Sequence, residues 1–243
     1  MIRAVIFDLY ETLITVFDPD WEPPKRSLAD RLGIPEEGFQ KRFSRLIDEW
    51  EIGRIGDFEE LLNRVCEESG REVPASVVAD LVRERSAEFS VPFDKIDPAI
   101  VEMIQKIKSM GLRVGVVTNV ANLDLAGWSK SELAPLIEHV VPSFEVGVMK
   151  PDPLIYRRGL EALQVEADDT LYVGDGGNDE LSGADRIGMT PFWATWFLER
   201  WPHGIRPGAR FDGDEWRQFS GHEPPYPRMD TPGKLSQWLL AER

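Results

Sequence analysis

Four short segments of the sequence carry the residue types that phosphoryl transfer needs. They hold Asp8, the pair Thr118 and Asn119, Lys150, and an acidic cluster of Asp175, Asp179 and Glu180. Two carboxylates can hold one Mg²⁺, which prefers oxygen ligands, and an ammonium supplies positive charge to phosphate oxygens. A carboxylate beside such a metal can attack phosphorus and form an acyl phosphate. The segments therefore predict a Mg²⁺ site for a small phosphorylated or otherwise anionic substrate, if the fold brings them together.

The elements that must position these residues alternate between strands and helices. Apolar runs predict strands at residues 3–9, 113–118, 139–142, 170–173 and 190–194. Amphipathic patterns predict helices at residues 97–111, 123–133, 152–163, 179–187 and 234–241. This alternation is typical of an α/β fold, a three-layer Rossmann-like core with a parallel sheet and right-handed crossovers. Ligands of such sheets bind beyond the carboxyl ends of the strands, which is where the four segments fall.

A long helical stretch interrupts this alternation after the first strand. Apolar residues from about position 15 to 92 recur at helical spacing, for example Phe39, Phe43, Leu46 and Trp50, and no strand is predicted among them. We therefore expect residues 15–92 to form an inserted α-helical cap, and residues 1–14 and 93–243 to form the core. The segment from 195 to 232 is rich in Trp, Pro and Gly, and we expect irregular structure packed on the core by its aromatic residues.

With these elements in place, the chain resembles the haloacid dehalogenase superfamily of hydrolases. The motifs that carry the resemblance are Asp8-x-x-x-Thr12, Thr118-Asn119, Lys150-Pro151, and Gly174-Asp175 followed by Asp179-Glu180. They occur in the family's order, and the helical insertion lies where the family has a small cap. The resemblance implies a phosphatase that works through a phospho-aspartate.

The resemblance also implies a role for each matching residue. Asp8 would be the nucleophile and a Mg²⁺ ligand, and the backbone carbonyl of Tyr10 a second ligand. Asp175 would bind the metal, with Glu180 as first choice and Asp179 as second choice for the remaining acidic ligand. The residues expected to act on or bind the substrate are Asp8, Tyr10, Thr12, Thr118, Asn119 and Lys150.

Two residues depart from the family pattern. Family phosphatases usually carry a second Asp two residues after the nucleophile, and here that residue is Tyr10. A phenol with a pKa of about 10 is a poor acid for the leaving group, so we expect weak turnover of alkyl phosphate esters. Glu11 stands where the family usually has Gly, and its carboxylate would repel Asp8 unless it points away. Tyrosine at position 10 is also similar to the metal-independent 2-haloacid dehalogenases, which are one alternative. A phospholigand-binding protein with low turnover is the other.

Composition excludes several other classes of function. The chain has 28 Lys and Arg against 43 Asp and Glu, a net charge of −15, so we expect no nucleic-acid partner and no anionic membrane surface. A single cysteine, Cys66, leaves no intramolecular disulfide, and no apolar run approaches a membrane span. We therefore expect a cytoplasmic monomer or homodimer. Candidates in the cap for contact with a second anionic group or a ring of the substrate are Arg26, Arg42, Arg45, Arg54, Arg85, Trp21 and Trp50.

Overall fold

The core of the protein is a parallel sheet of six strands. The computed structural model describes residues 1–17, 26–200, 210–211, 216–217 and 224–242. The strand order is β3-β2-β1-β4-β5-β8, and every neighbouring pair is parallel. The strands are β1 (Ala4–Phe7), β2 (Arg113–Thr118), β3 (His139–Pro142), β4 (Thr170–Gly174), β5 (Thr190–Ala194) and β8 (Arg228–Met229). A separate antiparallel pair joins β6 (Arg210–Phe211) and β7 (Trp216–Arg217).

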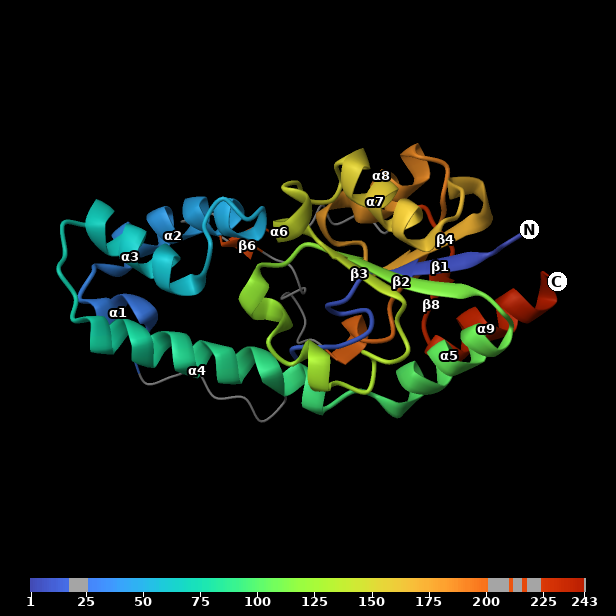
Figure 1. Ribbon diagram of the computed structural model, residues 1–243, viewed down its shortest axis with the longest axis horizontal. Helices are drawn as coiled ribbons and strands as arrows, with labels where there is room; N and C mark the ends of the chain where they lie inside the picture. Colours follow the sequence, from blue (N-terminus) through green and yellow to red (C-terminus); the bar gives the residue numbers. More distant parts are fainter. Residues whose placement is uncertain (18–25, 201–209, 212–215, 218–223, 243) are drawn as a thin grey trace.

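Helices cover both faces of this sheet, as Figure 1 shows. Helices α5 (Pro98–Ser109) and α9 (Pro232–Ala241) lie on one face, and α7 (Pro153–Leu163) and α8 (Glu180–Arg186) lie on the other. Strand β1 sends Val5 and Phe7 into the first layer and Ala4 and Ile6 into the second, because successive side chains of a strand point to opposite faces. The expected three-layer α/β core is confirmed.

The register of the strands brings the predicted chemistry to one edge of the sheet. Phe7 is paired with Val116 of β2 and with Val173 of β4. The residues that follow these positions, among them Asp8, Thr118 and Asp175, therefore meet beyond the carboxyl ends of the strands. This is the edge at which open α/β sheets bind ligands.

In the part of the chain that the structure describes, four helices precede α5 and extend from the core at this same edge (Figure 1). They are α1 (Leu28–Leu32), α2 (Glu36–Glu51), α3 (Phe58–Glu68) and α4 (Ala75–Asp94), here called the cap helices. The side chain of Asp57 caps the start of α3 by accepting the Glu60 N–H at 2.8 Å. The cap helices pack around their own apolar cluster, which includes Phe39, Leu46 and Trp50. The division into a cap of residues 15–92 and a core of residues 1–14 and 93–243 remains a prediction.

Several elements differ from the sequence-based expectation, among them the short strands β6, β7 and β8 in the segment that was expected to be irregular. The helix expected at residues 123–133 is wrong, because the structure has only the short 3-10 turns Asn122–Leu125 and Trp128–Lys130 there. A Cβ at Gly127, between these turns, would lie 2.7 Å from the Phe93 ring, so the close packing of this loop takes the place of a regular helix. Strand β8 was not expected, since two residues carry no alternating pattern, and β5 supplies its hydrogen-bonding edge.

The remaining elements are short. They are α6 (Ser143–Val146) and the 3-10 turns Ala167–Asp169, Gly177–Asp179 and Leu198–Arg200. Trp196, in the segment expected to pack on the core by its aromatic residues, is buried in one core layer. Trp193 is buried in the other layer, and the ring of Trp238 packs on that of Phe192 with 4.7 Å between the centroids. Trp201 lies outside the described residues, and so does Trp21 of the cap candidates.

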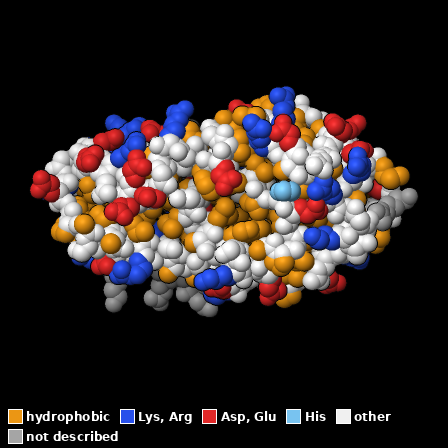
Figure 2. Space-filling model, viewed as in Figure 1, with side chains coloured by type: hydrophobic (Ala, Val, Ile, Leu, Met, Phe, Trp, Pro, Cys, Tyr) orange, Lys and Arg blue, Asp and Glu red, His pale blue; other side chains and the backbone are white. Residues whose placement is uncertain are grey.

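The face of the molecule shown in Figure 2 is mixed in charge and polarity. Within the described parts of the chain, no helix combines the length and the apolar character that crossing a bilayer demands. On the face shown in Figure 2, Lys and Arg side chains are interspersed with Asp and Glu and form no continuous basic patch. Hydrophobic side chains are visible on this face over the cap helices and in the middle of the molecule (Figure 2).

Candidate active site

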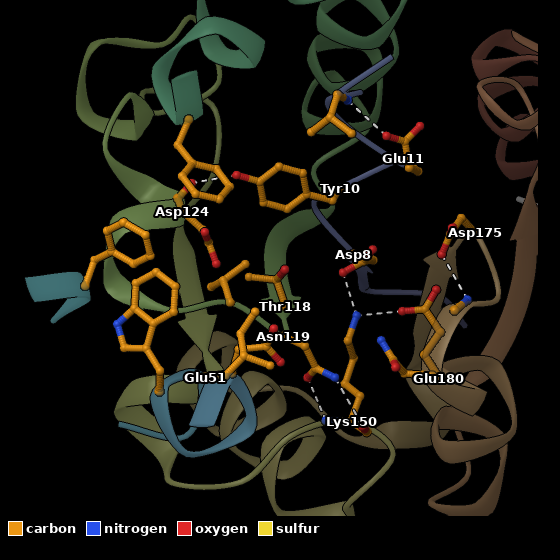
Figure 3. A pocket seen from close by; sticks show the side chains of 18 of the residues that line it. Asp8, Tyr10, Glu11, Glu51, Thr118, Asn119, Asp124, Lys150, Asp175 and Glu180 are labelled. Carbon is orange, nitrogen blue, oxygen red and sulfur yellow. Dashed lines mark hydrogen bonds and ion pairs between the residues drawn. The ribbon is translucent and has the colours of Figure 1, made fainter. Parts of the chain in front are cut away.

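A cavity of about 310 Å³ separates the strand ends from the cap helices. Asp8, Thr118, Asn119, Lys150, Asp175 and Glu180 line its core side, and residues of α2, α3 and α4 line the opposite side. Figure 3 shows the side chains of Asp8, Lys150 and Glu180 pointing toward one another from three separate segments. The fold therefore brings the four predicted motifs to one cavity.

The ammonium of Lys150 is the centre of this arrangement. Its Nζ donates to Asp8 Oδ1 at 2.5 Å, to Glu180 Oε2 at 2.6 Å and to the Tyr172 hydroxyl at 3.1 Å. The Lys150 side chain is 3% exposed. Three acceptors satisfy the three N–H groups of the ammonium, so these hydrogen bonds fix the position of the ammonium. Asp8 is thereby held at the floor of the cavity.

The motif after β2 positions this lysine through the backbone. The Asn119 side-chain amide accepts from the Lys150 N–H at 2.7 Å and donates to the Lys150 carbonyl at 3.1 Å. Thr118 is buried and lines the cavity beside it. Asn119 therefore positions Lys150. The sequence predicted only that Asn119 would bind the substrate.

The acidic motif after β4 is held by backbone N–H groups and a tyrosine. Gly176 N–H donates to Glu180 Oε1 at 3.0 Å, and the Tyr172 hydroxyl donates to Glu180 Oε2 at 2.8 Å. A Cβ at Gly174 would lie 2.0 Å from Glu180 Oε1, so only glycine permits this approach. Asp175 Oδ1 accepts the Gly177 N–H at 2.9 Å. Both carboxylates are therefore fixed before any ligand binds.

Burial controls the ionisation of these groups. Burial raises the pKa of Asp8 from 3.8 to about 6, although the nearby Lys150 charge lowers it, and the Glu180 charge adds to the rise. Burial, then the charges of Glu180 and Asp8, raise the pKa of Asp175 well above its usual value. Burial also opposes the charge on Lys150, but Asp8 and Glu180 outweigh it and raise the Lys150 pKa. Lys150 is therefore charged at neutral pH.

The charge balance of the cluster fits a bound divalent cation. Carboxylate oxygens of Asp8, Asp175 and Glu180 all lie within 4.8 Å of one another, and together these residues could hold a metal ion. Three carboxylates face the single ammonium of Lys150, so the cluster carries excess negative charge. Burial first, and then the charges of Glu180 and Asp8, raise the pKa of Asp175. A hard cation with oxygen ligands would remove that excess.

The two departures from the family pattern both point away from Asp8. The Tyr10 hydroxyl donates to the backbone carbonyl of Asp124 at 2.7 Å, and Figure 3 shows its ring directed to that side. Burial and the Asp124 charge raise the pKa of Tyr10 well above 10. Glu11 accepts from Thr15 Oγ1 at 2.7 Å and from the Val16 N–H at 2.9 Å. Neither side chain takes the place of a leaving-group acid beside Asp8.

Two of the predicted site residues are not brought to the cluster. Asp179 is exposed and lies outside the group of carboxylates that could hold a metal, whereas Glu180 belongs to it. Thr12 is fully buried and is not among the residues that line the cavity, and its carbonyl accepts from Trp196 Nε1 at 2.8 Å. Of the two acidic candidates, the geometry therefore favours Glu180 as the metal ligand. For Thr12 it favours a structural role over contact with the substrate.

Asp124 is a cavity residue that the sequence did not indicate. It lies in the segment expected to be helical, and its Oδ2 accepts the Ala121 N–H at 2.8 Å. Burial raises the pKa of Asp124 from 3.8 to about 6 despite that hydrogen bond and the charge of Arg85. An acidic residue six positions after the end of β2 is too common a pattern to single out.

Replacing Asp124 with Asn is expected to stabilise the protein at neutral pH. The folded pKa lies above the unfolded one, so the ionised carboxylate costs folding free energy that grows as pH rises from about 4 to 6. Asn keeps the acceptor for Ala121 without the charge. Urea denaturation of Asp124→Asn should show a gain of about 1–3 kcal/mol at pH 7.5 and little or none at pH 4. A gain that is equal at both pH values would contradict the ionisation argument.

Comparison with known proteins agrees with this geometry. The model of the haloacid dehalogenase-like hydrolase family matches residues 2–186. A glyceraldehyde 3-phosphate phosphatase of Methanopyrus kandleri is 26% identical over 198 residues, which cover 78% of this chain and 82% of the relative. A phosphoglycolate phosphatase of Yersinia pseudotuberculosis is 27% identical over 197 residues, with 78% and 81% covered.

Solved structures show the same fold. A 2-haloacid dehalogenase from Pseudomonas syringae pv. Tomato superposes with a TM-score of 0.67 at 23% identity and covers 100% of both chains. A Bacteroides thetaiotaomicron enzyme of the same family, solved with magnesium and inorganic phosphate, gives a TM-score of 0.56 at 17% identity, covering 80% of this chain and 94% of that one. With its family match over residues 2–186 and its four motifs at one cavity, this chain belongs to the haloacid dehalogenase-like hydrolases.

Proposed function

We propose that the protein is a phosphatase that hydrolyses a small phosphate monoester through a phospho-aspartate at Asp8. The observation that carries the proposal is the position of Asp8 at the floor of the cavity, bound to Lys150 at 2.5 Å and close to Asp175 and Glu180. The relatives named as phosphatases, at about a quarter identity over most of the chain, support the same reaction.

Each residue of this site has its own role in the proposed reaction. An Asp8 carboxylate oxygen attacks phosphorus, the bond to the ester oxygen breaks, and the leaving group departs with the electron pair. Water then attacks the phospho-aspartate and releases phosphate and the free carboxylate. Lys150 orients Asp8 and places a positive charge beside the phosphoryl oxygens, and Thr118 supplies a hydroxyl at the wall.

A Mg²⁺ ion would be held by Asp8, Asp175 and Glu180, and the backbone carbonyl of Tyr10 is a further candidate ligand. Such an ion supplies charge that allows a phosphate dianion to approach the carboxylates. Asp175 and Asp8, with their raised pKa values, are the groups whose ionised forms the ion would favour.

Phosphate release from acetyl phosphate tests this function. We expect release with Mg²⁺, loss of release with EDTA, and recovery when Mg²⁺ is added back. In parallel, 2-chloropropionate is offered with EDTA and chloride is measured. Chloride release in EDTA without phosphate release would show a metal-independent dehalogenase instead. Binding of phosphate without any turnover would show a phospholigand-binding protein.

The orientation of Tyr10 predicts a strong dependence on the leaving group. Because Tyr10 is bound to Asp124 and Glu11 to Thr15 and Val16, no acid of this loop protonates an alkoxide. General acid help is worth about 10²–10⁴-fold, so kcat/KM for acetyl phosphate should exceed that for a sugar phosphate by a factor in this range. Equal and fast turnover of both substrates would refute this assignment. Tyr10→Asp, which restores the usual family residue, should reduce the difference.

A further inference from the structure

The wall of the cavity that faces the carboxylates is aromatic. It consists of Phe43, Ile47 and Trp50 from α2, Phe58 from α3 and Phe89 from α4. Phe43, Ile47 and Phe89 are only half-buried, so part of each side chain is open to a ligand. A substrate whose phosphoryl group lies at Asp8 and Lys150 would place its organic part against this wall.

The charged groups beside that wall do not favour a second anionic group on the substrate. Of the cap arginines suggested by the sequence, Arg85 is the one among the described residues that lines the cavity. Its guanidinium donates to Glu88 at 2.7 Å and lies 4.3 Å from the centroid of the Phe89 ring. The other charged residues that line the cavity outside the cluster around Lys150 are Glu11, Glu51 and Asp124. A substrate carboxylate would therefore meet more negative than positive charge.

The leaving-group side of the site agrees with an aromatic ester. Since Tyr10 and Glu11 are turned to other partners, the leaving oxygen must depart without a proton from this loop. A phenolate, from an acid with a pKa of about 10, tolerates that far better than an alkoxide does. The missing acid therefore favours a phenolate leaving group, and the aromatic wall favours binding of the same aromatic ring.

We propose, on the basis of the phosphatase function proposed above, that the site selects aryl phosphates whose organic part carries no second anionic group. In this reaction an Asp8 oxygen bonds to phosphorus as the bond from phosphorus to the aryl oxygen breaks. The phenolate leaves with the electron pair and takes a proton from water. Hydrolysis of the phospho-aspartate then yields phosphate, so one water is consumed for each phenol and phosphate formed.

Non-hydrolysable phosphonates separate binding of the organic part from the leaving-group effect. Competitive inhibition of acetyl phosphate hydrolysis is measured with methylphosphonate, benzylphosphonate and phosphonoacetate, which add a methyl group, a ring and a carboxylate respectively. Burial of a ring on an apolar wall predicts that benzylphosphonate binds at least about 10-fold more tightly than methylphosphonate. Phosphonoacetate should bind no more tightly than methylphosphonate. The opposite order, with phosphonoacetate tightest, would overturn the proposal.

Matched variants on one helix locate the effect. Phe43 lines the cavity, and Phe39, one turn earlier on α2, stacks on it at 5.1 Å without lining the cavity. Phe43→Leu should weaken benzylphosphonate severalfold and leave methylphosphonate unchanged, whereas Phe39→Leu should change neither. Arg85→Gln should leave phosphonoacetate inhibition unchanged. If Arg85→Gln weakens phosphonoacetate about 10-fold, Arg85 binds a second anionic group and the proposal is wrong.

Failure of this proposal is distinguishable from failure of the proposed function. If acetyl phosphate is hydrolysed but the three phosphonates inhibit equally, the phosphatase function stands and the aromatic specificity falls. If acetyl phosphate is not hydrolysed, the phosphatase function falls. In that case the same three compounds are compared by isothermal titration calorimetry, and equal affinities overturn the aromatic preference as well.

Discussion

Asp8→Asn is expected to abolish phosphate release while the protein still binds phosphonates. The amide cannot form the acyl phosphate, and removal of a nucleophile costs several orders of magnitude in kcat, here at least about 10³-fold. Asn retains an acceptor for Lys150, whose bond to Asp8 Oδ1 is 2.5 Å long, so the cavity should keep its shape. Turnover of acetyl phosphate and calorimetric binding of methylphosphonate measure the two effects separately.

Asp179→Asn is the matched control for this variant. The change is chemically identical, but Asp179 is exposed and stands outside the carboxylate cluster. Its φ of 52° is one that Asn adopts readily, so the backbone is not strained. We expect turnover to stay at the level of the unaltered protein. Loss of turnover in Asp179→Asn with retention in Asp8→Asn would refute the assignment of both residues.

Lys150→Met is expected to reduce stability as well as activity. The change removes the cation that binds Asp8 and Glu180 in a region where the lysine side chain is 3% exposed. Removing one partner of a buried ion pair leaves uncompensated charge and costs about 3–5 kcal/mol. Urea denaturation at pH 7.5 in EDTA should show that the free energy of unfolding decreases by this amount. Phosphate release should also decrease, because Lys150 no longer orients Asp8.

The pH dependence of Lys150→Met provides a second test. Burial already raises the pKa of Asp8 to about 6, and without the Lys150 charge its folded pKa rises further. The folded state then binds more protons than the unfolded state between pH 4 and that pKa, so the variant gains stability as pH falls. The difference from the unaltered protein should therefore shrink from pH 7.5 to pH 5.5. A constant difference would show that lost packing, and not charge, is the cause.

Lys234→Met separates the buried pair from a surface pair. Lys234 donates to Asp230 at 2.7 Å, but its side chain is 54% exposed. Exposed pairs contribute little to stability because water and salt screen them, so this variant should be nearly as stable as the unaltered protein. A large loss in Lys234→Met would mean that any Lys→Met change at these ion pairs destabilises the chain.

The accuracy of the sequence-based predictions followed the length and regularity of the local patterns. The run at residues 113–118 became β2 with the expected bounds, and Asp97 with Pro98 began α5 as expected, with Asp97 Oδ1 accepting the Ala99 N–H. Residues 123–133 had apolar residues at helical spacing but folded into two 3-10 turns. The packing of Gly127 against Phe93, which is 34 positions away, was not visible in that local pattern.

In the candidate site, too, local sequence predicted which residues are present but not which residues they contact. The motif residues Asp8, Thr118, Lys150 and Asp175 were identified from their types and from the strand ends that precede them, and the structure places all four at one cavity. Asn119, expected at the substrate, lines the cavity, and its side chain also holds the Lys150 backbone. The direction of a side chain depends on partners from other elements, which a single sequence does not display.

By itself the sequence determined the α/β class, the positions of five of the sheet's strands and the residues able to perform chemistry, because these depend on periodicity and residue type over short stretches. Only the tertiary structure decided which groups meet. It joined Lys150 to Asp8 across 142 positions, turned Tyr10 toward Asp124 and placed aromatic residues of the cap helices opposite the carboxylates. The physical reason is that such contacts arise from the packing of whole elements, whose orientation is set by the entire core and not by any one segment.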